Sequence, residues 1–145
     1  IKGYWNNPAA TAESFTAGYW HSGDLGSIDT DDLVRVFDRQ KDMINRGGLK
    51  IYSAEVESVL AGHPDVVESA VIAKPCPVLG ERVHAVIVAR NAKASEETLR
   101  LWCSERLSDY KVPETMVLTT APLPRNANGK VMKRQLREDW ARAQA

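Results

Sequence analysis

The apolar and polar positions of the chain predict a series of short strands. Leu49 and Ile51 alternate with polar neighbours, which is the two-residue period of a strand. Two longer runs are apolar and rich in β-branched residues, and KPCPVLGER, with its two prolines and one glycine, predicts a connecting loop between them. The expected strands cover residues 33–37, 49–52, 66–73, 83–89 and 116–118.

Three segments have the apolar spacing of a helix. Ser53 is expected to cap the first, with Glu55 and Glu57 in the first turn, where the helix dipole favours anions. Gly62 and Pro64 supply its stop signal. The apolar stripe of this helix consists of Val56, Val59 and Leu60.

The second helix is expected to begin after Ser95 as its cap, and the third near Val131. Their apolar stripes are Leu99, Trp102, Cys103 and Leu107 in the second, and Met132, Leu136 and Trp140 in the third. We interpret Trp102 and Cys103 as core residues. The basic residues of the third helix, Lys133, Arg134 and Arg137, are interpreted as solvated. Strands and helices in this order predict an α+β fold.

Residues 1–37 predict an arm instead of a domain. An Asn-Asn-Pro turn signal comes first, residues 12–15 are expected to form a single helical turn, and the following turn-rich run leaves only Leu25 and Ile28 to bury. We therefore expect that, within this chain, the segment lacks much of the protein surface against which it packs.

Composition excludes several classes of protein. The 145 residues carry 19 Lys and Arg against 19 Asp and Glu, so a nucleic acid or an acidic membrane surface is not expected as a partner. No apolar run approaches the roughly 20 residues of a membrane span. Cys76 and Cys103 lack ligand or disulfide spacing, and His63 and His84 have no suitable neighbours, which predicts no metal site and a cytoplasmic setting.

The charged stretch at residues 38–46 is followed by Gly47 and Gly48, which can adopt positive φ and let a ligand lie against bare backbone. From the residues alone, this is a charged hairpin feeding a capped helix, in which Arg39 and Lys41 pair with neighbouring aspartates in solvent. Asp24, between glycines, is by the same reasoning a turn residue.

Three motifs change this interpretation: GYWHSGDLG at residues 18–26, DRQKDMINRGGLKIYSAEVE at 38–57 and PLPRNANGK at 122–130. In order and separation they resemble the adenylate-forming enzymes, the superfamily of acyl- and aryl-CoA ligases, peptide-synthetase adenylation domains and luciferases. The resemblance implies the small α+β C-terminal domain of that fold, a short mixed sheet packed with helices. Residues 1–40 would be the tail of a large N-terminal domain, ending in a hinge, and residues 41–145 a mobile catalytic lid.

The resemblance also implies roles for individual residues. Asp24 and Arg39 would bind the nucleotide ribose, and Lys41 would be the hinge. The missing side chains of Gly47 and Gly48 would leave room for the thiol arm of CoA. Lys130 would be the catalytic residue, binding the ATP phosphates and the carboxylate during adenylation.

The implied function is ATP-dependent acyl-CoA ligation of a fatty or aromatic acid through acyl-AMP. ATP and CoA would be substrates, and Mg²⁺ would enter with ATP, its ligands lying in the N-terminal domain. The chain alone is expected to be inactive, because it lacks the Ser/Thr/Gly-rich phosphate loop and the acid pocket. Its partners would be these substrates and its own N-terminal domain. Residues 124–130 read P-x-x-x-x-G-K, which resembles the recognition sequence for lysine acetylation in bacterial acyl-CoA synthetases, so a lysine acetyltransferase acting at Lys130 is also implied.

Two alternatives stay open. The chain could load a carrier protein instead of CoA, or it could be a non-catalytic binding module of the same fold. Light emission is disfavoured, because Asn45 stands where luciferases are expected to have lysine. The prolines and glycine of the last motif could also serve only to shape its loop.

Overall fold

The computed structural model describes residues 1–91 and 93–143 and divides into two compact units, Ile1–Lys41 and Asp42–Ala145. We call them the N-terminal unit and the C-terminal unit and describe each by itself. The sequence placed a boundary after residue 40, one position earlier.

The N-terminal unit contains one helix and two pairs of antiparallel strands. These are α1 (Pro8–Ser14), β1 (Phe15–Thr16), β2 (Tyr19–Trp20), β3 (Asp24–Ile28) and β4 (Val34–Arg39). The expected single turn at residues 12–15 is wrong: Asn7 caps α1 by accepting from the Ala10 amide at 3.0 Å, so the helix begins at Pro8. Ile28 was expected to be buried and is 68% exposed, because the hairpin has nothing packed over it within this unit.

The C-terminal unit is built on a mixed sheet with the strand order β6-β5-β8-β7, in which β9 runs parallel to β8. The strands are β5 (Ile44–Arg46), β6 (Leu49–Ile51), β7 (Val66–Cys76), β8 (Gly80–Ala89) and β9 (Thr115–Thr119). The helices are α2 (Ser53–Ala61), α3 (Glu96–Ser104) and α4 (Lys133–Arg142), with a 3₁₀ turn η1 (Asp109–Lys111). The predicted α+β fold with a short mixed sheet is confirmed.

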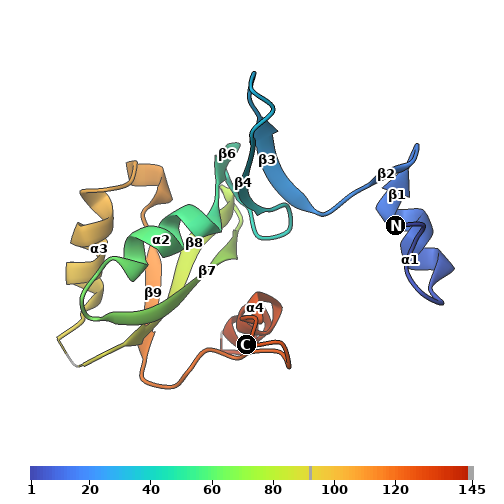
Figure 1. Ribbon diagram of the computed structural model, residues 1–145. Helices are drawn as coiled ribbons and strands as arrows, with labels where there is room; N and C mark the ends of the chain where they lie inside the picture. The colour runs from blue at the N-terminus through green and yellow to red at the C-terminus, as the bar shows by residue number, and fades with distance from the viewer. Residues whose placement is uncertain (92, 144–145) are drawn as a thin grey trace. The chain divides into compact units, whose positions relative to one another are not determined.

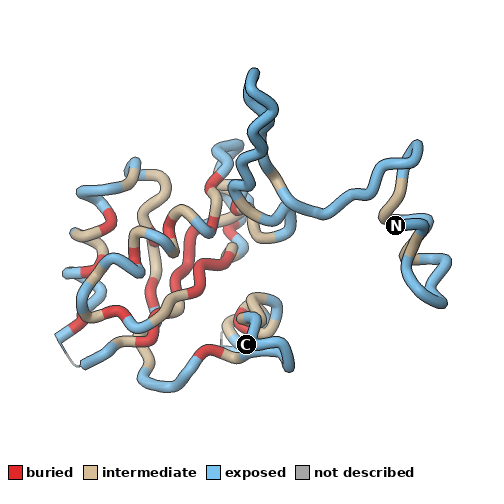
Figure 2. Tube along the Cα trace, in the orientation of Figure 1, coloured by how far each residue is buried: buried red, intermediate tan, exposed pale blue. Residues whose placement is uncertain are grey.

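Alternating residues of β7 and β8 supply two apolar clusters, one on each face of this sheet (Figure 1). Val71 and Ala85 belong to the cluster that α2 and α3 cover, whereas Ala70 and Ile72 pack with Leu136 of α4. The buried residues of the described chain all lie in this unit, as the red segments of Figure 2 show.

The predicted loop KPCPVLGER is mostly strand. β7 and β8 pair from Val66↔Ala89 to Cys76↔Gly80, which leaves only residues 77–79 for the turn. Pro75 is tolerated because β7 is an edge strand. The amide of Val71 points away from β8 and donates to Glu57. Pro75 lies four residues further along the strand and therefore faces the same way, so the N–H that it lacks would have pointed to the free edge.

Several local expectations need correction. Ser53 does not cap α2; it is the first helical residue and is fully buried, and Tyr52 is the cap position. Glu57 lies beyond the first turn. Trp102 was expected in the core but is only half-buried. Its indole N–H donates to the Val59 carbonyl at 2.8 Å, and the guanidinium of Arg106 stacks on its ring. Cys103 is fully buried, and the Ser95 cap is confirmed as a capping box with Thr98.

Lys133 is not a solvated residue. Its ammonium donates to Ser53 Oγ at 2.7 Å and pairs with Glu57 Oε1 at 2.6 Å, and its side chain is only 16% exposed. Glu57 also accepts from the Val71 amide at 2.7 Å, so this group ties α4, α2 and the outer edge of β7 together. Arg137, bound to Asp42 at 2.8 Å, is also mostly covered, whereas Arg134 is exposed as expected.

Candidate functional site

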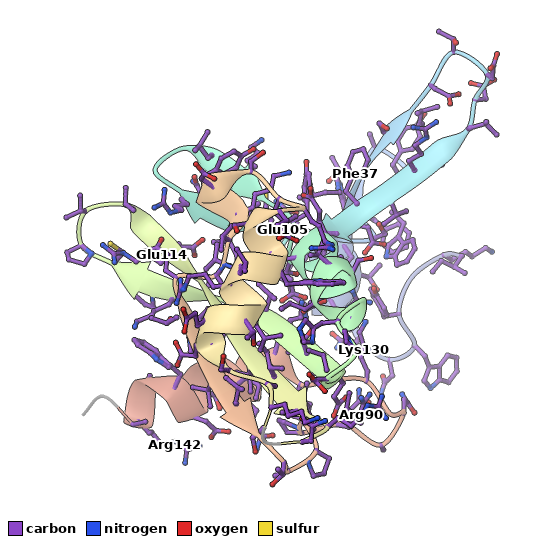
Figure 3. The ribbon with its side chains drawn as sticks, turned by 90° about the vertical axis from the view of Figure 1, so that its left-hand side faces the viewer. Phe37, Arg90, Glu105, Glu114, Lys130 and Arg142 are labelled. Atoms are coloured by element: carbon purple, nitrogen blue, oxygen red, sulfur yellow. The ribbon has the colours of Figure 1, made fainter. Side chains whose placement is uncertain are left out.

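Lys130 lies near the end of the loop between β9 and α4, and it is exposed (Figure 3). Its amide donates to Asn126 Oδ1 at 2.9 Å, and its carbonyl accepts from the Asn126 amide at 2.9 Å. Its ammonium makes no hydrogen bond or ion pair with residues 1–91 or 93–143. The backbone at Lys130 is therefore fixed while its charge remains available to a ligand.

The loop that carries Lys130 is a small closed hairpin. Arg125 and Val131 form an isolated antiparallel bridge, and the Met132 amide donates to the Pro124 carbonyl at 2.8 Å. The chain turns at Gly129, whose φ of +77° is a left-handed conformation that side chains disfavour. The sequence predicted an irregular loop here but did not predict these bonds.

Arg125 and Glu68 connect this loop to the sheet. Arg125 donates to the Gly129 carbonyl at 2.7 Å and forms an ion pair with Glu68, which also accepts from the Leu123 amide at 3.0 Å. Sequence reasoning missed both residues. Arg125 lies inside the PLPRNANGK motif, but nothing in the sequence links it to an acidic residue 57 positions away.

Asp24 and Arg39 are direct partners in the register of β3 and β4, and their charged groups lie 3.9 Å apart. Both side chains are partly exposed, so a ligand can reach them. The Gln40 amide donates to the Gly23 carbonyl at 2.8 Å and closes the hairpin beside them. Arg39 was expected to pair with Asp38 or Asp42, but its guanidinium forms its ion pair with Asp24.

Gly47 and Gly48 form the tight turn between β5 and β6, with φ values of +58° and +89°. The Gly47 amide donates to the Leu79 carbonyl at 2.8 Å, and the Gly48 amide donates to Asn45 Oδ1 at 3.1 Å. A Cβ at Gly48 would meet no atom within 4 Å, so the turn presents an open backbone surface. Positive φ, not crowding, is the reason for glycine at Gly48.

A network of charged side chains lies next to the Gly47–Gly48 turn. Glu114, which is labelled in Figure 3, accepts from Arg46 at 2.8 Å. It also pairs with Arg82 at 3.1 Å, so these contacts join β5, β8 and the segment before β9. Arg82 also donates to Cys76 Sγ at 3.1 Å. Backbone N–H groups of Leu79 and Val78, together with Arg82, hold the pKa of the Cys76 thiol below its ordinary value.

The Gly47–Gly48 turn and the Lys130 loop lie at opposite ends of β7. The turn contacts Leu79, which follows the last residue of β7, whereas the Lys130 loop is held by Glu68, near the first residue. The structure therefore brings Asp24 and Arg39 together in one unit and keeps the two candidate sites of the other unit apart. Lys41 is the last residue of the N-terminal unit.

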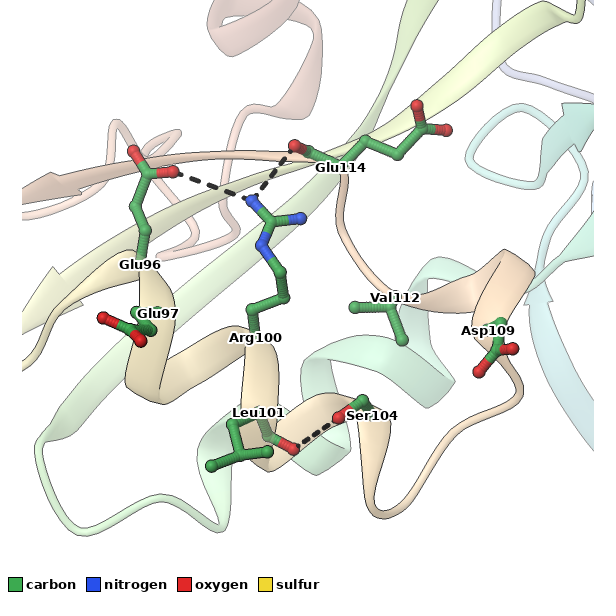
Figure 4. A pocket seen from close by; sticks show the side chains of 8 residues that line it. All are labelled: Glu96, Glu97, Arg100, Leu101, Ser104, Asp109, Val112 and Glu114. Atoms are coloured by element: carbon green, nitrogen blue, oxygen red, sulfur yellow. Dashed lines mark hydrogen bonds and ion pairs between the residues drawn. The ribbon is translucent and has the colours of Figure 1, made fainter.

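A surface hollow on the C-terminal unit contains none of these candidates. It lies beside α3 and η1, and Figure 4 shows its lining. Arg100 is its one basic lining residue, and its guanidinium is already bound to the carbonyls of Pro113 and Glu114, at 2.7 and 3.1 Å. The remaining ionisable lining residues are acidic, which does not suit an anionic nucleotide.

Within residues 1–91 and 93–143, no group of three acidic, histidine or cysteine side chains is placed to hold a metal ion. The Mg²⁺ expected to enter with ATP has its ligands, in that expectation, in the large N-terminal domain, and we derive no step through it. No helix in this part of the chain has the length and apolar composition needed to cross a bilayer. His84 is buried against Thr115, which agrees with its structural interpretation.

Comparison with known proteins identifies the family. The model of the AMP-binding enzyme C-terminal domain matches residues 55–130, more than half of the 145 residues. The chain belongs to this family. The match runs from Glu55, within α2, to Lys130, so it includes β7, Glu68 and the Lys130 loop as far as Lys130 itself.

The relatives are CoA ligases. The long-chain-fatty-acid–CoA ligase FadD13 of Mycobacterium tuberculosis is 42% identical over 97% of this chain and 28% of that protein. Feruloyl-CoA synthase of an Amycolatopsis species is 44% identical over 94% of this chain and 28% of that protein. The expected resemblance to acyl- and aryl-CoA ligases is confirmed, and the chain spans 28% of the length of these relatives.

A solved structure agrees in fold. The o-succinylbenzoate CoA synthetase of Bacillus subtilis, in complex with its acyl-adenylate intermediate, superposes with a TM-score of 0.86 at 40% identity. The match covers 93% of this chain and 28% of that one.

Proposed function

We propose that this chain is the C-terminal part of an ATP-dependent acyl-CoA ligase that activates a fatty or aromatic carboxylic acid as acyl-AMP and transfers the acyl group to CoA. The single observation that supports this most is Lys130: an exposed ammonium without a protein partner among the described residues, on a loop whose backbone is fixed by hydrogen bonds. Membership of a family whose relatives are CoA ligases supports the same reaction.

The first half-reaction needs a positive charge that can move into place. A carboxylate oxygen attacks the α-phosphorus of ATP, the bond to pyrophosphate breaks, and acyl-AMP forms. Two anions must approach each other in this step, and the ammonium of Lys130 stabilises their approach by Coulomb attraction, which is stronger where water is excluded. Asp24 and Arg39 hold the ribose in this proposal, because a carboxylate accepts from two vicinal hydroxyls and a guanidinium donates.

The second half-reaction needs a different surface. The thiol of CoA attacks the acyl carbon of acyl-AMP, AMP leaves, and the thiol proton is released. Lys130 has no task here, whereas the open backbone at Gly48 leaves room for the pantetheine arm. Because the two candidate sites lie at opposite ends of β7, a rotation of the C-terminal unit at Lys41 would exchange one for the other.

The test is Lys130→Ala in the enzyme that includes the large domain. Pyrophosphate release is expected to fall about 10²–10³-fold, the usual cost of losing one positioned charge-stabilising group. Thioester formation from supplied acyl-AMP and the melting temperature are expected to stay unchanged. Lys93→Ala, which removes another exposed lysine, is the matched control. Equal losses in both half-reactions would contradict the proposal.

Two further parts of the proposal use the same assay. Acetylation of Lys130 cancels its charge and is expected to reproduce the selective loss seen in Lys130→Ala, with recovery after deacetylation. The 145-residue chain by itself, without a phosphate loop, is expected to release no pyrophosphate.

A further inference from the structure

One guanidinium and one carboxylate hold the Lys130 loop at two points. Glu68, in β7, accepts from the amide of Leu123, a buried residue at the start of the loop. Arg125 is paired with the other oxygen of Glu68 and donates to the carbonyl of Gly129, the residue directly before Lys130. The hydrogen-bonded link from the sheet to the lysine therefore passes through these two side chains.

The other bonds of the loop are internal or lie at its base. Asn126 closes the turn onto Lys130, and Met132 returns to Pro124. None of these hydrogen bonds reaches β7; Val131, at the base of the turn, packs against the apolar cluster that contains Ala70 and Ile72. Among the described residues, Arg125 is the one side chain that bonds to both the turn and the sheet.

We propose that Arg125 and Glu68 are positioning residues, which place the backbone of Lys130 so that its ammonium reaches the reacting anions in one orientation. The inference rests on the proposed role of Lys130 in adenylation. A long lysine side chain can sample many positions if its backbone moves, and a displacement of about 1 Å at a catalytic group can lower a rate roughly 10²-fold.

A purely stabilising role predicts something different. Arg125 is 45% exposed and Glu68 21% exposed, and ion pairs with this exposure contribute little to global stability. Their removal is thus expected to leave the melting temperature nearly unchanged. The removal of either residue is instead expected to make the Lys130 loop less rigidly positioned, and this can be measured without any substrate.

The experiment compares Arg125→Ala, Arg125→Lys and Arg134→Ala in the enzyme with its large domain. Arg125→Lys keeps the charge but cannot bond to both Glu68 and the Gly129 carbonyl through one planar fork. Arg134→Ala removes an exposed arginine of α4 and serves as the control. Each variant is followed by hydrogen exchange of the amides of Gly129, Lys130 and Met132, and by both half-reactions.

Both Arg125 variants are expected to speed exchange at these amides, leave exchange in β8 unchanged, and lower pyrophosphate release about 10–10²-fold, within the range for a misplaced catalytic group. Thioester formation from supplied acyl-AMP stays at the parent rate, and Arg134→Ala behaves like the parent. Arg125→Lys with full activity would overturn the proposal, because charge alone would then suffice.

The outcomes separate this inference from the function on which it rests. Unchanged exchange in Arg125→Ala overturns the positioning role whatever the activity. Faster exchange with full pyrophosphate release, in an enzyme that Lys130→Ala inactivates, also overturns it. If Lys130→Ala itself is fully active, the proposed function fails, and the exchange data alone then decide whether Arg125 orders the loop.

Discussion

The two units of this chain use their apolar residues in opposite ways. In the C-terminal unit they fill two clusters on the faces of one sheet, whereas the N-terminal unit has no buried residue at all. Its large apolar side chains that are at least half exposed are Ile1, Trp5, Tyr19, Trp20, Ile28, Leu33, Val34 and Val36. A two-stranded hairpin such as β3 and β4 is marginal in water without a packing partner. We therefore expect the large domain to cover this unit.

The candidate residues follow the same division. Asp24 and Arg39 sit on a hairpin that lacks a core, so their geometry depends on what packs against it. Lys130 sits on a loop anchored to a strand of the core through Glu68. The comparison teaches that charged side chains are exposed in both units, whereas only the C-terminal unit has a core to which the backbone carrying the charge is anchored.

The largest expected effect comes from the same substitution in the two units. Leu60 is fully buried in α2, and Leu60→Ala is expected to lower the free energy of unfolding of the 145-residue chain by about 2–5 kcal/mol, since a cavity remains in the core. Leu33 is 60% exposed, and Leu33→Ala is expected to change it by less than about 0.5 kcal/mol. Urea denaturation followed by circular dichroism measures both. A cost for Leu33→Ala as large as that for Leu60→Ala would show that the N-terminal unit has a core of its own.

Periodicity predicted most of the elements that build the core. The strand expected at residues 49–52 is observed as Leu49–Ile51, one residue shorter, and the stripes of α2 and α3 bury Val56, Leu60, Leu99 and Cys103. Such patterns are local, and burial of one face is what selects them. The extension of β7 through Pro75 was not predicted, because proline is unfavourable in a strand unless its nitrogen lies on a free edge, and edge position depends on topology.

The site was predictable to a smaller extent. Motif resemblance singled out Lys130, and the exposed position expected for it is the one observed. The bonds between Arg125 and Glu68 and between Lys133 and Glu57 join residues that are distant in sequence, and single charged residues carry no signal of their partners. Lys133 was interpreted as solvated for that reason, although its side chain is the least exposed of the four basic side chains of α4.

The second effect is smaller and depends on pH. Burial, together with the nearby charge of Lys74, lowers the pKa of His84 to about 4. Between its ordinary pKa of about 6.5 and pH 4, the unfolded chain binds a proton that the folded chain does not, so stability is expected to fall as pH falls, by at most about 3 kcal/mol. His84→Gln is expected to flatten the pH dependence of the unfolding free energy.

His21→Gln is the matched replacement in the N-terminal unit, where the side chain is exposed. Unfolding free energies measured at intervals from pH 4.5 to 7 give the slope for each variant and for the parent. If His84→Gln keeps the slope of the parent, or if His21→Gln flattens it equally, burial of His84 in the C-terminal unit is not the source of the pH dependence.

The smallest expected effect on stability, with a selective effect on activity, belongs to the boundary between the units. In the enzyme with its large domain, Lys41→Pro fixes φ near −65° at the last residue of the N-terminal unit. Because Lys41 is exposed and outside the core, Lys41→Pro leaves no cavity, and the loss of unfolding free energy is expected to be smaller than that of Leu60→Ala. A rotation at this residue would be hindered, so acyl-AMP should form at the parent rate while its conversion to thioester slows.

Lys41→Ala removes the same side chain but leaves the backbone free, and it is expected to keep both rates. Rapid-quench measurement of acyl-AMP and thioester in one turnover separates the steps. If Lys41→Pro makes thioester as fast as the parent, the rotation occurs at another residue, and the boundary between the two units is not the hinge.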